Sequence, residues 1–392
     1  MVVLTRVILI AVLLSSATAG PASASDYMQA YREHVAALER GDRQAAAEAG
    51  ERAWRLAEDE IGGSRETALL AYNFASLVYW DRPEDAIAPF VRAGELLGPR
   101  ADAFGAEDPE LGAALCRARR ADANAADHKA LDQLIDRRRA SGETAASIMG
   151  ARALQMIANR RLEKRQTRKA IAAADEAVDM FRAVAPAVKA LQASPLMTGA
   201  AARIADIARR SRRDARRQKP VLVEVYRALD DIIEMFGPQT SIETFDPILA
   251  VAYGWSAAAG ALEETLFDGD EQPSAAEMAL ADRPAGYGAV KWADGVKPAD
   301  GECAVVWLAR KAPPYPQGDA NRGTVGAVVV GYHIGEQGLA EGVRVLSEVP
   351  EKSKFSEFAL KAVETWRADT ASLANPQCRR NRLVVFKFAL QL

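Results

Sequence analysis

The chain has 392 residues, more than one domain usually holds, so two or three domains are expected. Hydrophobic residues make up 49% of the sequence but aromatic residues only 7%, and alanine, which favours helices, carries much of the apolar content. The 50 basic and 53 acidic residues give a net charge of −3, which argues against a nucleic-acid-binding protein. The three histidines and three cysteines are scattered, so neither a metal site nor another cofactor is predicted.

Residues 1–24 show the pattern of a secretory signal peptide. Arg6 precedes the apolar run 7–14, and the small residues 22–24 form an A-x-A cleavage site. A membrane-spanning helix needs about 20 predominantly apolar residues, and this run stops at Ser15. We therefore predict export with cleavage, which gives a periplasmic protein. An uncleaved inner-membrane anchor, with the rest of the chain facing the periplasm, is the alternative.

Residues 25–267 have the periodicity of successive helices. Apolar residues recur at helical spacing, and short polar breaks stand at 39–42, 62–64 and 140–142. Octads rich in small residues begin at Ala46, Ala86 and Ala170, so the second follows the first by 40 residues and the third follows the second by 84. This spacing indicates a degenerate repeat of about 40 residues.

The stretch 71–86 resembles a tetratricopeptide repeat. Residues 71–80 fit its first helix and residues 82–86 the start of its second, with small residues where the two helix axes would approach closely. We predict an all-α repeat domain of tetratricopeptide-like αα-hairpins over 25–267. An irregular, alanine-rich helical bundle is the alternative.

A basic run occupies 209–219, with seven cations in eleven residues. A solvated helix face is the favoured interpretation. The alternative is a weak, salt-sensitive contact with an anionic membrane. The arginines that would make this contact are Arg209, Arg210, Arg212, Arg213, Arg216 and Arg217.

The pattern changes after Phe267. Residues 268–302 are rich in glycine and proline and predict a loop-rich linker. From Cys303 the pattern is that of strands. The alternating run 325–334, the turn 335–338 and the run 339–347 predict a β-hairpin. An apolar stripe over 355–366 predicts a helix, and 383–390 a final strand with its even-numbered side chains buried.

This β-β-α-β region, 303–392, resembles the C-terminal domain of the TonB energy-transducer family. The predicted fold class is therefore multidomain, with an all-α repeat followed by a small α+β domain. The matching features are Pro314-Tyr315-Pro316, Gly326-x-Val328-x-Val330, Gly338, Val343-x-Val345-Leu346-Ser347, the helix from Ala359 to Trp366, and Phe386-x-Phe388-x-Leu390.

The resemblance implies a binding function rather than an enzymatic one. Such a domain grasps a short periplasmic segment of an outer-membrane β-barrel transporter by strand addition and relays energy from an inner-membrane proton-motive complex. Main-chain groups at an unpaired sheet edge supply the affinity. The resemblance places this edge on the final strand, with Leu383, Val385, Lys387 and Ala389.

The chain departs from that family in lacking a Pro-rich spacer and in showing a helical repeat region instead. We therefore predict a periplasmic, non-enzymatic interaction protein that binds an outer-membrane transporter or another periplasmic protein. One alternative is a membrane-anchored energy transducer that also contacts the inner-membrane complex. Another is a cell-envelope scaffold that acts through the helical repeats.

The remaining chemistry-bearing residues are few. Cys303 and Cys378 are disulfide candidates in an oxidising compartment, with two buried free thiols as the alternative, and Cys116 is expected as a buried helical cysteine. His34, His128 and His333 stand apart from one another. The sequence contains no H-E-x-x-H, G-x-S-x-G, P-loop or Rossmann glycine pattern, so no catalytic residue is predicted.

Overall fold

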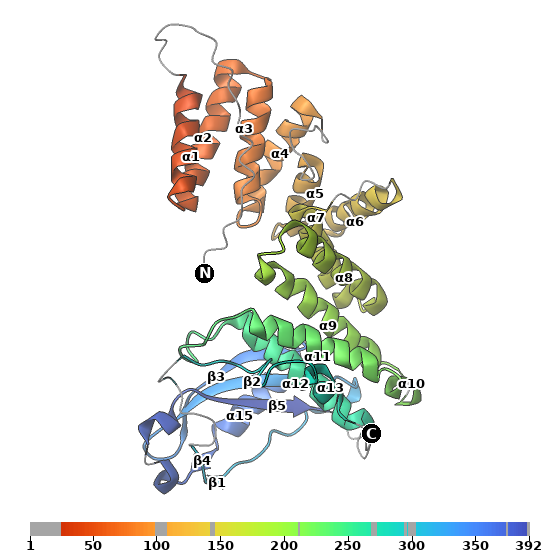
Figure 1. Cartoon of the computed structure of the whole chain (residues 1–392), viewed down its shortest axis with the longest axis vertical. Coiled ribbons are helices and arrows are strands. Elements are labelled where there is room, and N and C mark those ends of the chain that lie inside the picture. The colour runs from red at the N-terminus through yellow and green to blue at the C-terminus, as the bar shows by residue number, and fades with distance from the viewer. Residues whose placement is uncertain are drawn as a thin grey trace. The chain divides into compact units, whose positions relative to one another are not determined.

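The computed structural model describes residues 25–98, 108–141, 146–210, 212–267, 273–293, 296, 303–373 and 375–389. The predicted signal peptide, 1–24, lies outside these residues. The chain divides into two compact units, one of residues 1–157 with 179–186 and one of residues 158–178 with 187–392. Figure 1 colours the elements along the chain from red to blue. Among the described residues, no helix combines the length and the apolar character needed to cross a membrane.

The first unit is built of helices that each pack on the next in sequence, from α1 to α6. Helices end at the predicted breaks. At two of these breaks a polar side chain caps the N-terminus of the helix that follows. Asp42 accepts a hydrogen bond from Ala45 N at 3.0 Å, and Ser64 accepts one from Thr67 N at 3.0 Å. The helices of this unit are α1 (Asp26–Glu39), α2 (Arg43–Ile61), α3 (Arg65–Val78), α4 (Pro83–Leu97), α5 (Pro109–Arg119), α6 (Ala125–Ala140), most of α7 (Ile148–Glu163) and the end of α8 (Thr167–Val184).

Small residues occupy the core of the helical region, as the octads predict. Ala46, Ala86 and Ala170 are completely buried, and so is the last alanine of each octad. Side chains this short let neighbouring helix axes approach closely. The helical prediction for this region is confirmed, whereas the tetratricopeptide resemblance stays a prediction.

The second unit contains a helical layer and a sheet. Helix α11 packs on α9, α12 and α13 around buried residues such as Leu222, Leu229 and Ile232. The helices and 3-10 turns of this layer, after the start of α8, are η2 (Lys189–Gln192), α9 (Ala193–Ala208), α10 (Arg212–Arg216), α11 (Lys219–Glu234), α12 (Pro247–Phe267) and α13 (Ala275–Leu280).

The sheet has three antiparallel strands in the order β3-β2-β5. Strand β2 (Gly326–Ile334) lies in the centre, between β3 (Ala340–Val349) and β5 (Arg382–Phe388), and α15 (Phe355–Val363) connects β3 to the segment that leads to β5. The predicted β-β-α-β order is thus confirmed. A short ribbon of β1 (Trp307–Ala309) and β4 (Arg367–Ala368), helix α14 (Gln317–Asn321), and the turns η3 (Thr370–Leu373) and η4 (Pro376–Arg379) complete the unit.

Helices cover both faces of this sheet (Figure 1). On one face the even-numbered residues of β2 and β5 pack with α15 and Trp366, and on the other face α12 contacts all three strands. Glycine allows α12 to lie close to the sheet, because a Cβ on Gly254 would be 2.9 Å from Ser347 Oγ. The sheet is therefore the middle layer between two helical ones.

Two segments differ from the expected pattern. The described part of the predicted linker 268–302 contains α13, whose Ala275 and Ala279 are buried against the helical layer. Helix α15 ends at Val363, short of the predicted Trp366, yet Trp366 remains buried and donates from Nε1 to Lys311 O at 2.9 Å. The predicted domain limits themselves stay a prediction.

Candidate functional site: the outer edge of β5

The two edge strands of the sheet differ in regularity. Strand β5 pairs with β2 without interruption from Gly326 opposite Phe388 to Tyr332 opposite Arg382. Strand β3 shifts register against β2 twice, and in each case β3 carries the extra residue. Bulges twist an edge strand and interrupt the pairing that another chain would need. The edge of β5 is therefore the better template for an added strand.

The outer side of β5 is unpaired within the described residues, where β2 is its only neighbouring strand. Its even-numbered side chains belong to the core: Phe386 and Phe388 are buried, and Val384 packs partly against the same cluster. The backbone of β5 is thus hydrogen-bonded to β2 on one side, and on the other side no described strand pairs with it.

The odd-numbered side chains singled out from the sequence share the opposite face. Leu383 and Val385 are partly buried against the helical layer and α12. Lys387 is exposed, and its Nζ lies 2.6 Å from Glu264 Oε1 on α12. Ala389 follows the last residue of the strand. A partner would consequently meet the main chain of β5 more readily than the side chains of Leu383 and Val385.

A polar network fixes the start of β5. Asn381, in the left-handed region with φ 51°, donates from its backbone N to His333 Nδ1 at 3.2 Å and accepts from Ile242 N at 3.1 Å. Because His333 Nδ1 accepts, its ring proton lies on Nε2, 2.9 Å from Glu243 Oε1. This hydrogen bond is the largest of the causes that lower the pKa of Glu243 to about 2, and hydrogen bonds with Ser241 and with the Glu243 backbone add to it. His333 therefore positions the chain that enters the edge strand.

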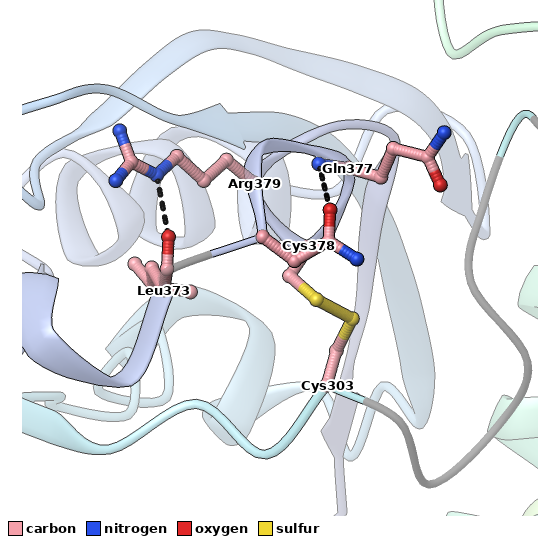
Figure 2. The surroundings of a disulfide bond; sticks show 6 residues. Cys303, Leu373, Gln377, Cys378 and Arg379 are labelled. Atoms are coloured by element: carbon pink, nitrogen blue, oxygen red, sulfur yellow. Dashed lines mark hydrogen bonds between the residues drawn. A yellow bond between two sulfur atoms is a disulfide. The ribbon is translucent and has the colours of Figure 1, made fainter.

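A disulfide joins Cys303 to Cys378, with Cα atoms 5.4 Å apart (Figure 2). Cys378 lies in η4, where Arg379 Nε donates to Leu373 O at 3.1 Å. The bond ties the segment before β1 to the segment before β5. Cys116, by contrast, is a free buried cysteine whose pKa burial raises to about 12, so its thiol stays protonated and unreactive.

The basic run is partly engaged within the protein. Arg209 donates to Arg165 O at 2.9 Å, Arg210 pairs with Asp206, and Arg216 donates from Nε to Leu266 O at 2.7 Å near the end of α12. The remaining arginines with described side chains, Arg213 and Arg217, are exposed. The side chain of Arg212 lies outside the described part of the chain. Contact of this run with an anionic membrane stays a prediction.

A small antiparallel sheet backed by a helix, with one regular edge that is unpaired among the described residues, has the geometry that strand addition requires. Residues 311–389 match the family described as Gram-negative bacterial TonB protein C-terminal, which confirms the resemblance seen in the sequence. The matched segment contains β2, β3, α15 and β5. The comparison with curated proteins found no match, and neither did the comparison with solved structures.

The sequence did not lead us to predict that α12 covers the second face of the sheet. A usable signal was present, because residues 247–267 are apolar around most of the helix, which is typical of a helix buried on several sides. It also missed the β1–β4 ribbon, whose strands of three and two residues are too short to show alternation. Within the described residues, no cluster of His, Cys, Asp or Glu side chains could hold a metal ion.

Proposed function

We propose that this is a periplasmic protein whose C-terminal domain binds an extended segment of an outer-membrane β-barrel transporter, adding it as a strand to β5. The observation that carries the proposal is the uninterrupted register of β5 together with the absence, in the described part of the chain, of a strand paired to its outer side. An added strand gains main-chain hydrogen bonds along the whole edge. The bulges of β3 disfavour the same reaction at the opposite edge.

The expected affinity is modest. Each added main-chain hydrogen bond contributes a net ~0.5–1.5 kcal/mol, and the ordering of a flexible segment offsets part of the sum. A segment of about five residues should therefore bind in the micromolar range and release readily. The second partner of such a protein would bind the helical unit.

The experiment is site-directed disulfide trapping on the full chain. Lys387→Cys places a thiol at the β5 edge, and the matched control Arg344→Cys places one at an exposed position of β3. The probe is a synthetic peptide of the periplasmic N-terminal segment of a TonB-dependent transporter, carrying one cysteine. The native cysteines do not compete, because Cys116 is buried and the other two are bonded to each other.

We expect the peptide to cross-link to the Lys387→Cys protein and not to the Arg344→Cys protein. Hydrogen exchange should also slow in 382–389 and stay unchanged in 340–349 when the cysteine-free peptide is added to the unmodified chain. Equal trapping at both edges, or no slowing in β5, would overturn the proposal.

The compartment is tested separately. N-terminal sequencing of the native protein should find Ser25 as its first residue if residues 1–24 are a cleaved signal peptide. A retained Met1 together with membrane fractionation would favour the anchored energy transducer. Full biological activity after deletion of residues 303–392 would favour a scaffold that acts through the helical repeats.

A further inference from the structure

Two arginines from different helices converge on one indole ring in the first unit. Trp80, just after α3, has the Arg119 guanidinium carbon 3.7 Å from its ring centroid and the Arg152 guanidinium carbon at 4.0 Å. Arg152 also lies 5.2 Å from the Tyr79 ring centroid, and Arg119 Nε donates to Trp80 O at 2.9 Å. Helices α5 and α7 thus bring two cations to the end of α3.

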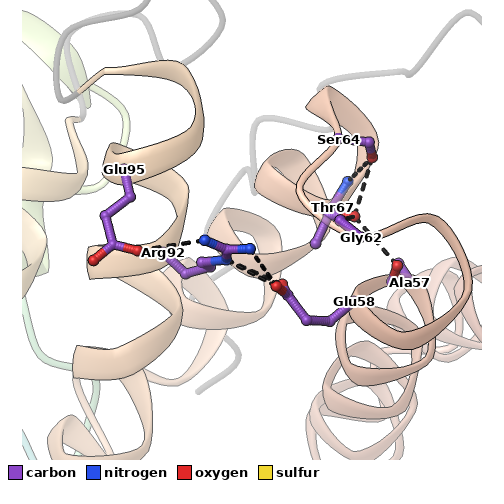
Figure 3. Close-up of polar contacts among 7 residues, drawn as sticks. All are labelled: Ala57, Glu58, Gly62, Ser64, Thr67, Arg92 and Glu95. Carbon is purple, nitrogen blue, oxygen red and sulfur yellow. Dashed lines mark hydrogen bonds and ion pairs between the residues drawn. The ribbon is translucent and has the colours of Figure 1, made fainter.

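Among the described residues neither guanidinium group forms an ion pair with a carboxylate, unlike many arginines of the same unit, although the charge of Asp81 acts on Arg119. Figure 3 shows the usual arrangement, in which Arg92 lies between Glu58 and Glu95. Asp81, adjacent to Trp80 in sequence, pairs with Arg43 at 3.3 Å. Further pairs in this unit are Arg52–Glu33, Arg55–Glu51 and Arg138–Asp108.

The two positively charged guanidinium groups repel each other. Both side chains are only partly exposed, and the pKa of Arg119 is lowered first by burial and then by the charge of Arg152. The aromatic ring offsets part of this cost, because cations over an indole face are attracted to it. An anion between or beside the two guanidinium groups would offset much more of their mutual repulsion.

We propose that Arg119, Arg152 and Trp80 form a binding site for the carboxylate groups of an acidic polypeptide segment. The planar guanidinium fork matches a carboxylate with two parallel hydrogen bonds. A membrane surface is the less suitable occupant, because both guanidinium-bearing side chains lie partly buried among helices. The site is independent of the β5 edge and gives the helical unit a partner of its own.

The test is fluorescence anisotropy with the full chain and a fluorescein-labelled nonapeptide containing four glutamates. Arg152→Gln removes one cation that makes no hydrogen bond among the described residues. Arg117→Gln, which replaces an exposed arginine of α5, is the matched control with the same loss of charge. Arg152→Lys keeps the positive charge but loses the planar guanidinium group that can make two parallel hydrogen bonds to a carboxylate.

We expect Arg152→Gln to weaken binding at least tenfold, Arg117→Gln less than twofold, and Arg152→Lys by an intermediate factor. The all-glutamine peptide should bind at least tenfold more weakly than the glutamate peptide. Far-ultraviolet circular dichroism and thermal melting should match those of the unmodified protein.

The proposal is overturned if the glutamate peptide does not bind, or if Arg152→Gln and Arg117→Gln weaken it equally. It is also overturned if phosphatidylglycerol vesicles, and not the peptide, bind in an Arg152-dependent way. Peptide trapping at Lys387→Cys is unaffected by Arg152→Gln if both sites exist, so the failure of either proposal can be recognised on its own.

Discussion

The ring of Phe388, at the end of β5, stacks on the ring of Phe355, the first residue of α15, with centroids 4.2 Å apart and planes inclined by 10°. Tyr315 meets both rings edge-on. This stack fastens the candidate edge strand to the helix on one face of the sheet, while Lys387, the preceding residue, lies on the other face beside Glu264. Two consecutive residues thus hold β5 in different ways: Phe388 by stacking on a buried ring and Lys387 by a solvent-exposed ion pair.

Phe388→Ala should lower the free energy of unfolding by about 3–5 kcal/mol, because it removes a buried ring from a packed aromatic cluster. Lys387→Ala should cost less than ~1 kcal/mol, since its ion pair is exposed to solvent. Urea unfolding of the full chain measures the free energy of unfolding that each variant loses. Similar losses for the two variants would show that the stack does not anchor β5.

Loss of the Cys303–Cys378 bond should destabilise the second unit. The bond closes a loop with a sequence separation of 75, for which the chain-entropy model gives a stabilisation of about 4 kcal/mol. Cys303→Ser should therefore unfold at lower urea concentration than the unmodified protein, and reductant should shift the unmodified protein to match it. Mass spectrometry under non-reducing conditions must also find the cross-linked peptide pair. Two free thiols there would contradict the assignment.

Asp230 should make stability depend on pH. Burial, and next the charge of Asp231, raise its pKa from 3.8 to about 6. The folded state therefore binds this proton more tightly than the unfolded state, so the stabilisation is complete below pH ~4 and is lost as the pH rises through about 6.

Asp230→Asn removes this titration. The variant should be more stable than the unmodified protein by up to about 3 kcal/mol at pH 8, and the difference should shrink as the pH falls to 4. Urea unfolding across this pH range gives the difference directly. A difference that does not change with pH would contradict the raised pKa.

The Arg138–Asp108 ion pair should contribute strongly to the stability of the first unit. Its side chains are both 9% exposed, Arg138 Nη2 lies 2.8 Å from Asp108 Oδ1, and the same oxygen accepts from Leu111 N at the start of α5. Arg138→Met leaves a buried carboxylate without its cation, so it should cost about 3–5 kcal/mol. Arg52→Met, which breaks a pair that is 54% and 49% exposed, should cost less than ~1 kcal/mol. Equal melting temperatures of the two variants would contradict the role of burial.

Much of the local structure follows from the sequence. The breaks at 39–42 and 62–64 became helix ends because Asp42 and Ser64 can cap the following helices. The alternation of Val328, Val330, Tyr332 and Ile334 fixed the core face of β2, since side chains on a strand alternate between its two faces. These are short-range effects, and neighbouring residues are sufficient to determine them.

Three decisive features are long-range. Helix α12 lies on the sheet, β3 rather than β5 carries the bulges, and Trp80 meets both Arg119 and Arg152. Each of them joins segments separated by many residues, and the sequence pattern of one segment does not specify its distant partner. By itself the sequence determined the succession of helices, the β-β-α-β order that follows it and the family of the C-terminal domain. Only the tertiary structure decided which side of β5 has no paired strand among the described residues, because edge pairing and the cover of each sheet face depend on contacts between distant parts of the chain.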